Sequence, residues 1–140
     1  PVGSIDGVQF VNDSKGTNVG ATLAAVDGLG RDHPGRLILL LGGQGKGADF
    51  SSLNEPVAQL CKSSWVFGQD QEQIVAALSA GGRSSTVHRV DTMEQALAGA
   101  EAEALTGDIV LLSPACASFD QFNDFQHRGD VFRSWVEARL

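Results

Sequence analysis

Five consecutive aliphatic residues, at positions 37–41, run without a polar interruption and lead directly into a glycine-rich segment, Gly-Gly-Gln-Gly-Lys-Gly, at 42–47. A strand with one solvent-exposed face alternates apolar and polar side chains, whereas a strand of a parallel sheet is covered on both faces and is apolar throughout. The run therefore predicts a parallel strand with helices on both faces of its sheet. Residues 108–113 form a second largely apolar strand, which Pro114 ends.

Strand-like and helix-like segments alternate along the rest of the chain. An Asp6-Gly7 turn comes before the first of them, and a strand preceding that turn would be short. We predict further strands at 8–11, 64–67 and 86–90, and helices at 19–29, 54–61, 74–78, 93–100 and over most of 115–140. This alternation predicts an α/β, Rossmann-like three-layer sandwich, a mostly parallel sheet of about six strands with helices on both faces.

Residues with capping or helix-ending chemistry mark the predicted helix boundaries. They are Thr17 or Asn18 as the first N-cap, Gly28 and Gly30 as its stop, and the capping pairs Asp70 with Gln73 and Asp91 with Glu94.

Composition limits the function classes. The 140 residues suit one domain, and 10 Lys and Arg against 17 Asp and Glu give a net charge of −7, which argues against nucleic-acid binding. The longest apolar run is far below the ~18 residues of a membrane span.

Two cysteines and three scattered histidines form neither a disulfide framework nor a metal-binding motif. No leader is recognisable, so we expect a cytoplasmic protein. The chain begins with proline, so we expect it to be either processed or a fragment.

The segment Asn-Asp-Ser-Lys-Gly-Thr-Asn at 12–18 follows a strand and opens a helix, where free N–H groups attract anions. Lys15 adds a positive charge suited to phosphate or carboxylate, Thr17 a hydroxyl, and Asp13 an acceptor for ribose hydroxyls. An ordinary capped turn would carry the same residue types, so the pattern by itself leaves both interpretations open.

Two further loops lie at predicted carboxyl ends of strands. The 42–47 segment lacks the Ser or Thr of a Walker loop, but its glycines allow a ligand to come close and Lys46 could pair with a carboxylate or phosphate. The alternative is a flexible connector with a solvated lysine. In the loop that starts at residue 113, Ser118 and neighbouring N–H groups could hold a carboxylate. Cys116 has no adjacent base, so a buried structural thiol is favoured, and Arg128 is expected to anchor a loop.

Three segments together resemble the C-terminal domain of the Mur ligases, and most closely the branch that adds D-glutamate. They are Asn-Asp-Ser-Lys-Gly-Thr-Asn (12–18), Gly-Gly-Gln-Gly-Lys-Gly-Ala-Asp-Phe (42–50), and Ser-Pro-Ala-Cys-Ala-Ser-Phe-Asp-Gln-Phe (113–122) with Phe-Gln-His-Arg-Gly (125–129). The resemblance covers essentially all 140 residues. One departure is Gln44, which stands where many relatives carry Asp and would form no salt bridge.

The resemblance implies a three-domain enzyme of peptidoglycan precursor synthesis, in which this domain binds the amino acid. ATP and Mg²⁺ would serve amide formation between UDP-MurNAc-L-Ala and D-glutamate, with the metal ligands on a central ATPase domain outside this chain. The domain would close over ATP and the UDP-sugar, and the chain alone would be inactive. The implied roles are Asp13 for the ATP ribose, Lys15 for the phosphates and catalysis, Thr17 and Lys46 for one D-glutamate carboxylate, Ser118 and Phe119 for the other, and Phe125 against the same substrate.

Two alternatives stay open. One is a sister ligase that adds a different amino acid, or a folylpolyglutamate-type synthetase. The other is a non-catalytic nucleotide- or acid-binding module of flavodoxin or Rossmann type.

Overall fold

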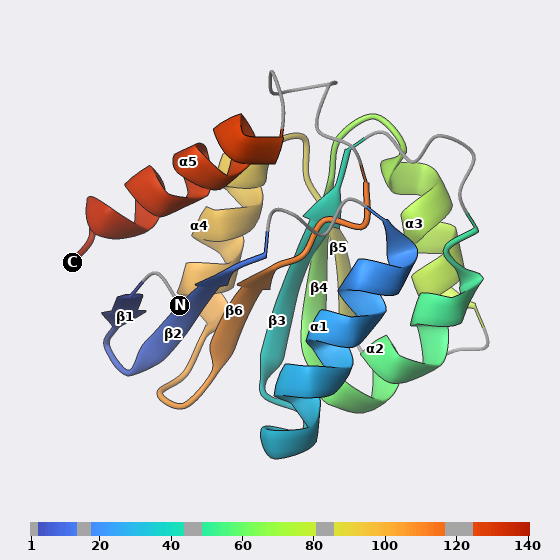
Figure 1. The fold of residues 1–140 in the computed structure, drawn as a ribbon, viewed down its shortest axis with the longest axis horizontal. Helices are drawn as coiled ribbons and strands as arrows, with labels where there is room; N and C mark the ends of the chain where they lie inside the picture. Colours follow the sequence, from blue (N-terminus) through green and yellow to red (C-terminus); the bar gives the residue numbers. More distant parts are fainter. Residues whose placement is uncertain (1–2, 14–17, 44–48, 81–85, 117–124) are drawn as a thin grey trace.

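The computed structural model describes residues 3–13, 18–43, 49–80, 86–116 and 125–140. Helices and strands alternate along these residues, as the sequence predicts (Figure 1). In chain order the elements are β1 (Gly3–Ile5), β2 (Val8–Asn12), α1 (Val19–Asp32), β3 (Leu37–Gly42), the 3₁₀ helix η1 (Ser51–Leu53), α2 (Asn54–Leu60), β4 (Cys61–Phe67), α3 (Gln71–Ser79), β5 (Thr86–Arg89), α4 (Met93–Glu103), β6 (Ile109–Leu112) and α5 (Phe125–Glu137).

The strands form one six-stranded sheet in the order β1-β2-β6-β3-β4-β5. Only β1 is antiparallel, because it joins β2 through the tight Asp6-Gly7 turn, in which both residues have positive φ. The other four neighbouring pairs are parallel. Strand β6 is the last strand in the sequence, yet it lies between β2 and β3 near the centre of the sheet.

Each face of the sheet packs against its own set of helices. Leu37, Leu39 and Leu41 face a core with α1, α2 and α3, whereas Ile38 and Leu40 face a core with α4 and α5. All six residues of β3 are buried, because helices cover both faces (Figure 1). The predicted α/β, Rossmann-like three-layer sandwich is confirmed.

Several predicted boundaries are wrong by a few residues. Helix α1 continues through Gly28 and Gly30 to Asp32. A Cβ at Gly30 would lie 2.8 Å from the Cβ of Leu60, so this glycine allows α1 and α2 to approach closely and does not end the helix. Strand β4 begins at Cys61, three residues earlier than predicted, because it pairs with the whole of β3.

The caps also differ in part from the prediction. Asn18 caps α1 by accepting a hydrogen bond from the Ala21 N–H, one of the two predicted alternatives. Helix α4 has a capping box made by Thr92 and Gln95 in place of Asp91 and Glu94. Asp70 stands at the N-cap of α3 but its side chain makes no capping hydrogen bond there.

Candidate functional site

The carboxyl ends of β2, β6 and β3 meet at one edge of the sheet, where the chain leaves neighbouring strands in opposite directions. The chain after β3 proceeds to α2 on one face, and the chain after β6 proceeds to α5 on the other. Open α/β sheets bind their ligands at such a switch point. This edge is therefore the candidate functional site.

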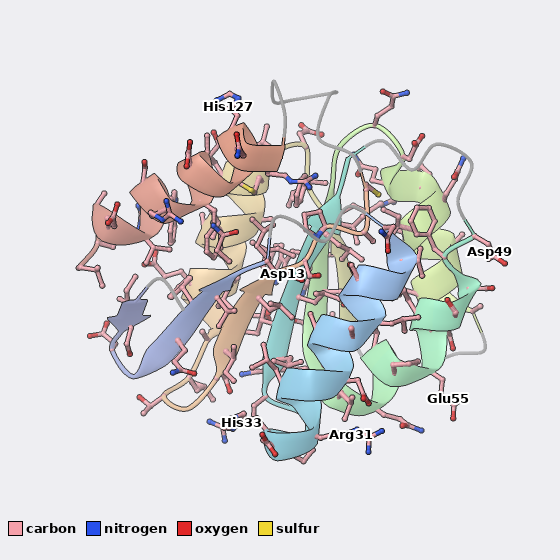
Figure 2. The ribbon with its side chains drawn as sticks, in the orientation of Figure 1. Asp13, Arg31, His33, Asp49, Glu55 and His127 are labelled. Carbon is pink, nitrogen blue, oxygen red and sulfur yellow. The ribbon has the colours of Figure 1, made fainter. Side chains whose placement is uncertain are left out.

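Asp13 lies at the end of β2 and is fixed to β6 by both its backbone and its side chain. Its N–H donates to the Leu112 carbonyl oxygen at 2.8 Å, and its Oδ2 accepts a hydrogen bond from Ser113 Oγ at 3.0 Å. The residue is partly exposed, and Figure 2 shows it near the centre of the molecule beside α1. A fixed and accessible carboxylate at the switch point is suited to accept hydrogen bonds from a ligand's hydroxyl groups.

Two buried hydroxyl groups lie beneath Asp13. Thr22, on the inner face of α1, donates from Oγ1 to the Ser113 carbonyl oxygen at 3.0 Å, and the two hydroxyl oxygens are 3.1 Å apart. Both residues are fully buried. They tie α1 to the end of β6 and hold the segments on either side of the site in a fixed relation.

Glycines are required where β3 ends. Gly42 has φ of +146°, and a Cβ at this position would lie 1.9 Å from the Phe67 carbonyl oxygen. The Gly42 N–H donates to the Pro114 carbonyl oxygen at 3.0 Å, and the carbonyl oxygen of Gly43 accepts from the Asp70 N–H at 3.1 Å. The start of the glycine-rich segment is thus packed tightly between the ends of β4 and β6.

Helix α5 anchors the loop after β6. Arg128 is fully buried, and its Nη1 donates to the Cys116 carbonyl oxygen at 2.9 Å, which confirms the expected loop-anchoring role. Asn12 Nδ2 donates to the Gly129 carbonyl oxygen at 3.4 Å. Ala115 has a positive φ of 64°, which is uncommon for a residue with a side chain. The two hydrogen bonds hold Cys116 and the end of β2 close to the first half of α5.

Most residues that the sequence singled out lie outside the described part of the chain. These are Lys15, Thr17, Gln44, Lys46, Ser118 and Phe119, while Phe125 begins α5 with a side chain that is not described. Asp13 is the predicted site residue that the structure describes in full. The convergence of Lys15, Lys46 and Ser118 at one edge of the sheet stays a prediction.

Sequence reasoning missed Ser113 and Thr22 as contributors to the site. Ser113 has a visible signal, since it is a polar residue directly after a buried apolar strand. Thr22 gives only a weak one, a single hydroxyl on the buried side of an Ala- and Val-rich helix. Their contact depends on β6 lying beside β2. The order of the strands in the sheet cannot be predicted from any local sequence pattern.

The cysteines are buried and structural. Burial raises the pKa of the Cys61 thiol to about 12, so this thiol is protonated near neutral pH. Cys116 is 1% exposed. A nucleophilic cysteine is an accessible thiolate, and Cys61 and Cys116 do not have that character.

The described residues contain neither a metal-binding cluster nor a helix that could span a membrane. Within these ranges no group of three or more His, Cys, Asp or Glu side chains could hold a metal ion. None of the helices of the described segments is both long and apolar enough to cross a membrane.

Comparisons with known proteins give a consistent result. A family model described as "Mur ligase, glutamate ligase domain" matches residues 1–116. The UDP-N-acetylmuramoylalanine–D-glutamate ligases of Chromohalobacter salexigens, Legionella pneumophila and Pseudomonas savastanoi pv. phaseolicola are 55%, 49% and 52% identical to the chain. These matches cover 94%, 98% and 95% of this chain but only 28%, 30% and 29% of the relatives. The chain thus spans less than a third of their length.

A solved structure is similar in fold. It is a domain assigned to a UDP-N-acetylmuramate:L-alanyl-γ-D-glutamyl-meso-diaminopimelate ligase of Haemophilus ducreyi. The TM-score is 0.61 at 14% identity, and the match covers 96% of this chain and 95% of the other. At this identity the likeness supports the fold alone.

Proposed function

The chain belongs to the family of Mur ligase glutamate ligase domains, and we propose that it is the amino-acid-binding domain of a longer ligase that joins D-glutamate to UDP-MurNAc-L-Ala at the expense of ATP. The observation that carries this proposal is 49–55% identity, over nearly the whole chain, to relatives named UDP-N-acetylmuramoylalanine–D-glutamate ligase. The position of Asp13 at the switch point of the sheet supports a nucleotide on this edge. The cytoplasmic location expected from the sequence remains a prediction.

The proposed reaction forms an amide in two steps. A carboxylate oxygen of UDP-MurNAc-L-Ala attacks the γ-phosphorus of ATP, and ADP leaves an acyl phosphate behind. The amine of D-glutamate then attacks the acyl carbon, the amine loses a proton, and phosphate departs. In this scheme Asp13 binds the ATP ribose and Lys15 faces the phosphates, where its positive charge offsets the charge that develops during transfer.

D-glutamate carries two carboxylates, and the proposed site provides partners for both. Thr17 and Lys46 are assigned to one carboxylate, Ser118 and Phe119 to the other, and Phe125 to a contact with the same substrate. All five lie in segments that follow β2, β3 and β6 in the sequence, the strands that end at the switch-point edge. The domain then contributes orientation and charge compensation, and it supplies no nucleophile of its own.

The other parts of the enzyme are proposed to lie in the longer protein. The Mg²⁺ ligands are proposed to lie on the central domain, and within the described residues of this chain no group of three or more His, Cys, Asp or Glu side chains could hold a metal ion. Closure of this domain over ATP and the UDP-sugar would keep water from the acyl phosphate. An unchanged scattering profile of the full-length enzyme on addition of all ligands would contradict closure.

The proposal is tested on the full-length ligase by ADP release with each amino acid as acceptor. Lys46→Ala is expected to raise the KM for D-glutamate by about 10- to 100-fold, because a charge-assisted hydrogen bond contributes about 1.5–3 kcal/mol. Lys15→Ala is expected to lower kcat by about 100-fold or more. The KM for ATP should change little in the Lys46 variant.

Arg31→Ala is the matched control for loss of one positive charge. Arg31 lies in the last turn of α1, where its side chain is 74% exposed and pairs with Asp27, and Figure 2 shows it far from Asp13. Its removal should leave all kinetic constants unchanged. Equal or better use of meso-diaminopimelate or L-alanine would contradict the assignment to D-glutamate and favour a sister ligase.

A further inference from the structure

Among the described residues, one oxygen of the Asp13 carboxylate has a hydrogen-bond donor and the other has none. Oδ2 accepts the hydrogen bond from Ser113 Oγ at 3.0 Å, and no other described residue donates to Oδ1. The backbone is fixed as well, through the N–H bond to Leu112 at 2.8 Å. Asp13 is partly exposed, so Oδ1 is the oxygen that we expect a ligand on this edge of the sheet to use, and its direction depends on the bond at Oδ2.

The protons available in this cluster direct the Ser113 hydroxyl toward Asp13. An ionised carboxylate only accepts, so the proton in the contact between Ser113 and Asp13 must come from Ser113. The proton of Thr22 is donated to the Ser113 carbonyl oxygen. Ser113 has a second possible acceptor in Thr22 Oγ1, at 3.1 Å, but a hydrogen bond to a charged acceptor is about twice as strong as one to a neutral hydroxyl.

We infer that Ser113 is a positioning residue, which holds the Asp13 carboxylate so that Oδ1 meets a ribose hydroxyl of ATP. This inference rests on the proposed function, since it takes Asp13 as the ribose contact. Ser113 is fully buried and cannot contact the nucleotide itself. Its effect on ATP must therefore pass through Asp13.

The role has a specific kinetic signature. Without the Ser113 hydroxyl, Asp13 still reaches the ribose but is no longer held in one rotamer, so nucleotide binding weakens and selectivity for the ribose hydroxyls falls. The backbone of residue 113, where the loop toward Ser118 and Phe119 begins, is unchanged by Ser113→Ala. The KM for D-glutamate should therefore stay the same.

The test compares Ser113→Ala, Asp13→Ala and the double variant in the full-length ligase, with ATP, 2′-deoxy-ATP and 3′-deoxy-ATP as substrates. Ser113→Ala should raise the KM for ATP by about three- to tenfold and reduce the preference for ATP over at least one deoxy analogue, with kcat within about twofold. Asp13→Ala should abolish that preference. In the Asp13→Ala background, Ser113→Ala should add less than about twofold, because the two residues act as a unit.

Thr22→Val is the matched control. It removes a buried hydroxyl from the same cluster but leaves the bond between Ser113 and Asp13 intact, so it should lower the melting temperature and reduce nucleotide selectivity much less than Ser113→Ala does. Ser113→Thr retains the hydroxyl and should restore selectivity. If Ser113→Ala does not yield folded enzyme, Ser113→Cys, close in size and a weak donor, takes its place.

The possible outcomes distinguish the positioning role of Ser113 from the ribose contact of Asp13. Full nucleotide selectivity in Ser113→Ala, together with its loss in Asp13→Ala, would overturn the positioning role while the ribose contact stands. Full selectivity in both variants would overturn the ribose contact of the proposed function. Additive effects in the double variant would mean that Ser113 acts independently of Asp13, which also overturns the inference.

Discussion

At the scale of single residues, Asp108 shows how this protein accommodates a buried carboxylate. Its side chain is 2% exposed, yet it pairs with Arg36 Nε at 2.8 Å and Lys62 Nζ at 2.7 Å, and it accepts from the Leu105 N–H at 2.8 Å. Burial by itself raises the pKa of the carboxyl, but the hydrogen bonds from Leu105, Lys62 and Arg36 outweigh it and lower the pKa below its ordinary value.

Asp108→Asn should therefore reduce the free energy of unfolding by about 2–3 kcal/mol near neutral pH, because it leaves two cations without their shared partner. Urea titrations of the 140-residue chain would measure this. Asp27→Asn is the control, since its pair with Arg31 is exposed and should contribute less than about 0.5 kcal/mol.

The pH dependence of the same difference has a definite sign. In the unfolded chain the carboxyl titrates near its reference pKa of about 3.9, whereas the lowered pKa keeps it ionised in the folded chain. The stability advantage of the parent chain over the Asp108→Asn variant should be constant above about pH 5, and it should fall as the pH decreases through about 4 toward the folded pKa. An advantage that grows with acidification would contradict the assigned ion pairs.

Gly42 presents a different residue-scale constraint, at the end of β3. Gly42→Ala should destabilise the fold by about 3 kcal/mol or more, because the new Cβ would meet the Phe67 carbonyl oxygen at 1.9 Å with φ at +146°. Gly28→Ala is the matched control. Gly28 lies in α1, and a Cβ built there would meet no atom within 4 Å apart from its chain neighbours and the backbone of its own helix, so the substitution should stabilise the chain by up to about 1 kcal/mol in the same titration.

At the scale of elements, substitutions at the start of α4 can test which residues cap this helix. The Gln95 N–H donates to Thr92 Oγ1 at 3.2 Å, while Gln95 Oε1 accepts from the Thr92 N–H at 3.2 Å. Thr92→Ala should lower stability by about 1 kcal/mol. Glu94→Gln changes the residue that the sequence pattern pairs with Asp91, and the stability of this variant should stay within about 0.5 kcal/mol of the parent. The reverse ranking in thermal unfolding would show that Asp91 and Glu94 form the cap.

The elements themselves were predictable because their signals are local. The apolar run at 37–41 marks β3, and the spacing of Met93, Ala96, Leu97 and Ala100 marks α4, whose buried face they form. The boundaries were less predictable, since two overlapping residue pairs satisfy the capping-box pattern at α4. Gly30 resembles a helix stop but is explained only by its contact with Leu60 on α2, which is tertiary.

For the candidate site, the position of Asp13 was predictable from the sequence, but its contact with Ser113 was not. Asp13 follows a strand directly, so its place at the ligand-binding edge follows from the fold class. Its attachment to Ser113 joins residues 100 positions apart. That contact requires β6 to return between β2 and β3, which the fold class allows but no local pattern specifies.

At the scale of the whole molecule, this strand order leads us to expect that the domain folds as a single cooperative unit. The central strand β6 is among the last elements in the chain, so the sheet is complete only when nearly all residues are in place. Both faces are covered by helices of the same chain, which gives the domain its own core. We therefore expect the 140 residues to fold without the rest of the proposed ligase.

Folding alone is not expected to confer ligase activity. The proposed roles of this chain are to orient D-glutamate and compensate charge, and the phosphate loop and metal site are assigned to the rest of the protein. Purified chain 1–140 should therefore form no ADP in the presence of ATP, D-glutamate and UDP-MurNAc-L-Ala. In backbone NMR titrations, ATP and D-glutamate should bind only weakly, with Kd on the order of millimolar, since each would meet part of its site. Micromolar binding of a mononucleotide would favour an independent nucleotide-binding module, and ADP formation coupled to D-glutamate ligation would show that the chain contains a complete active site.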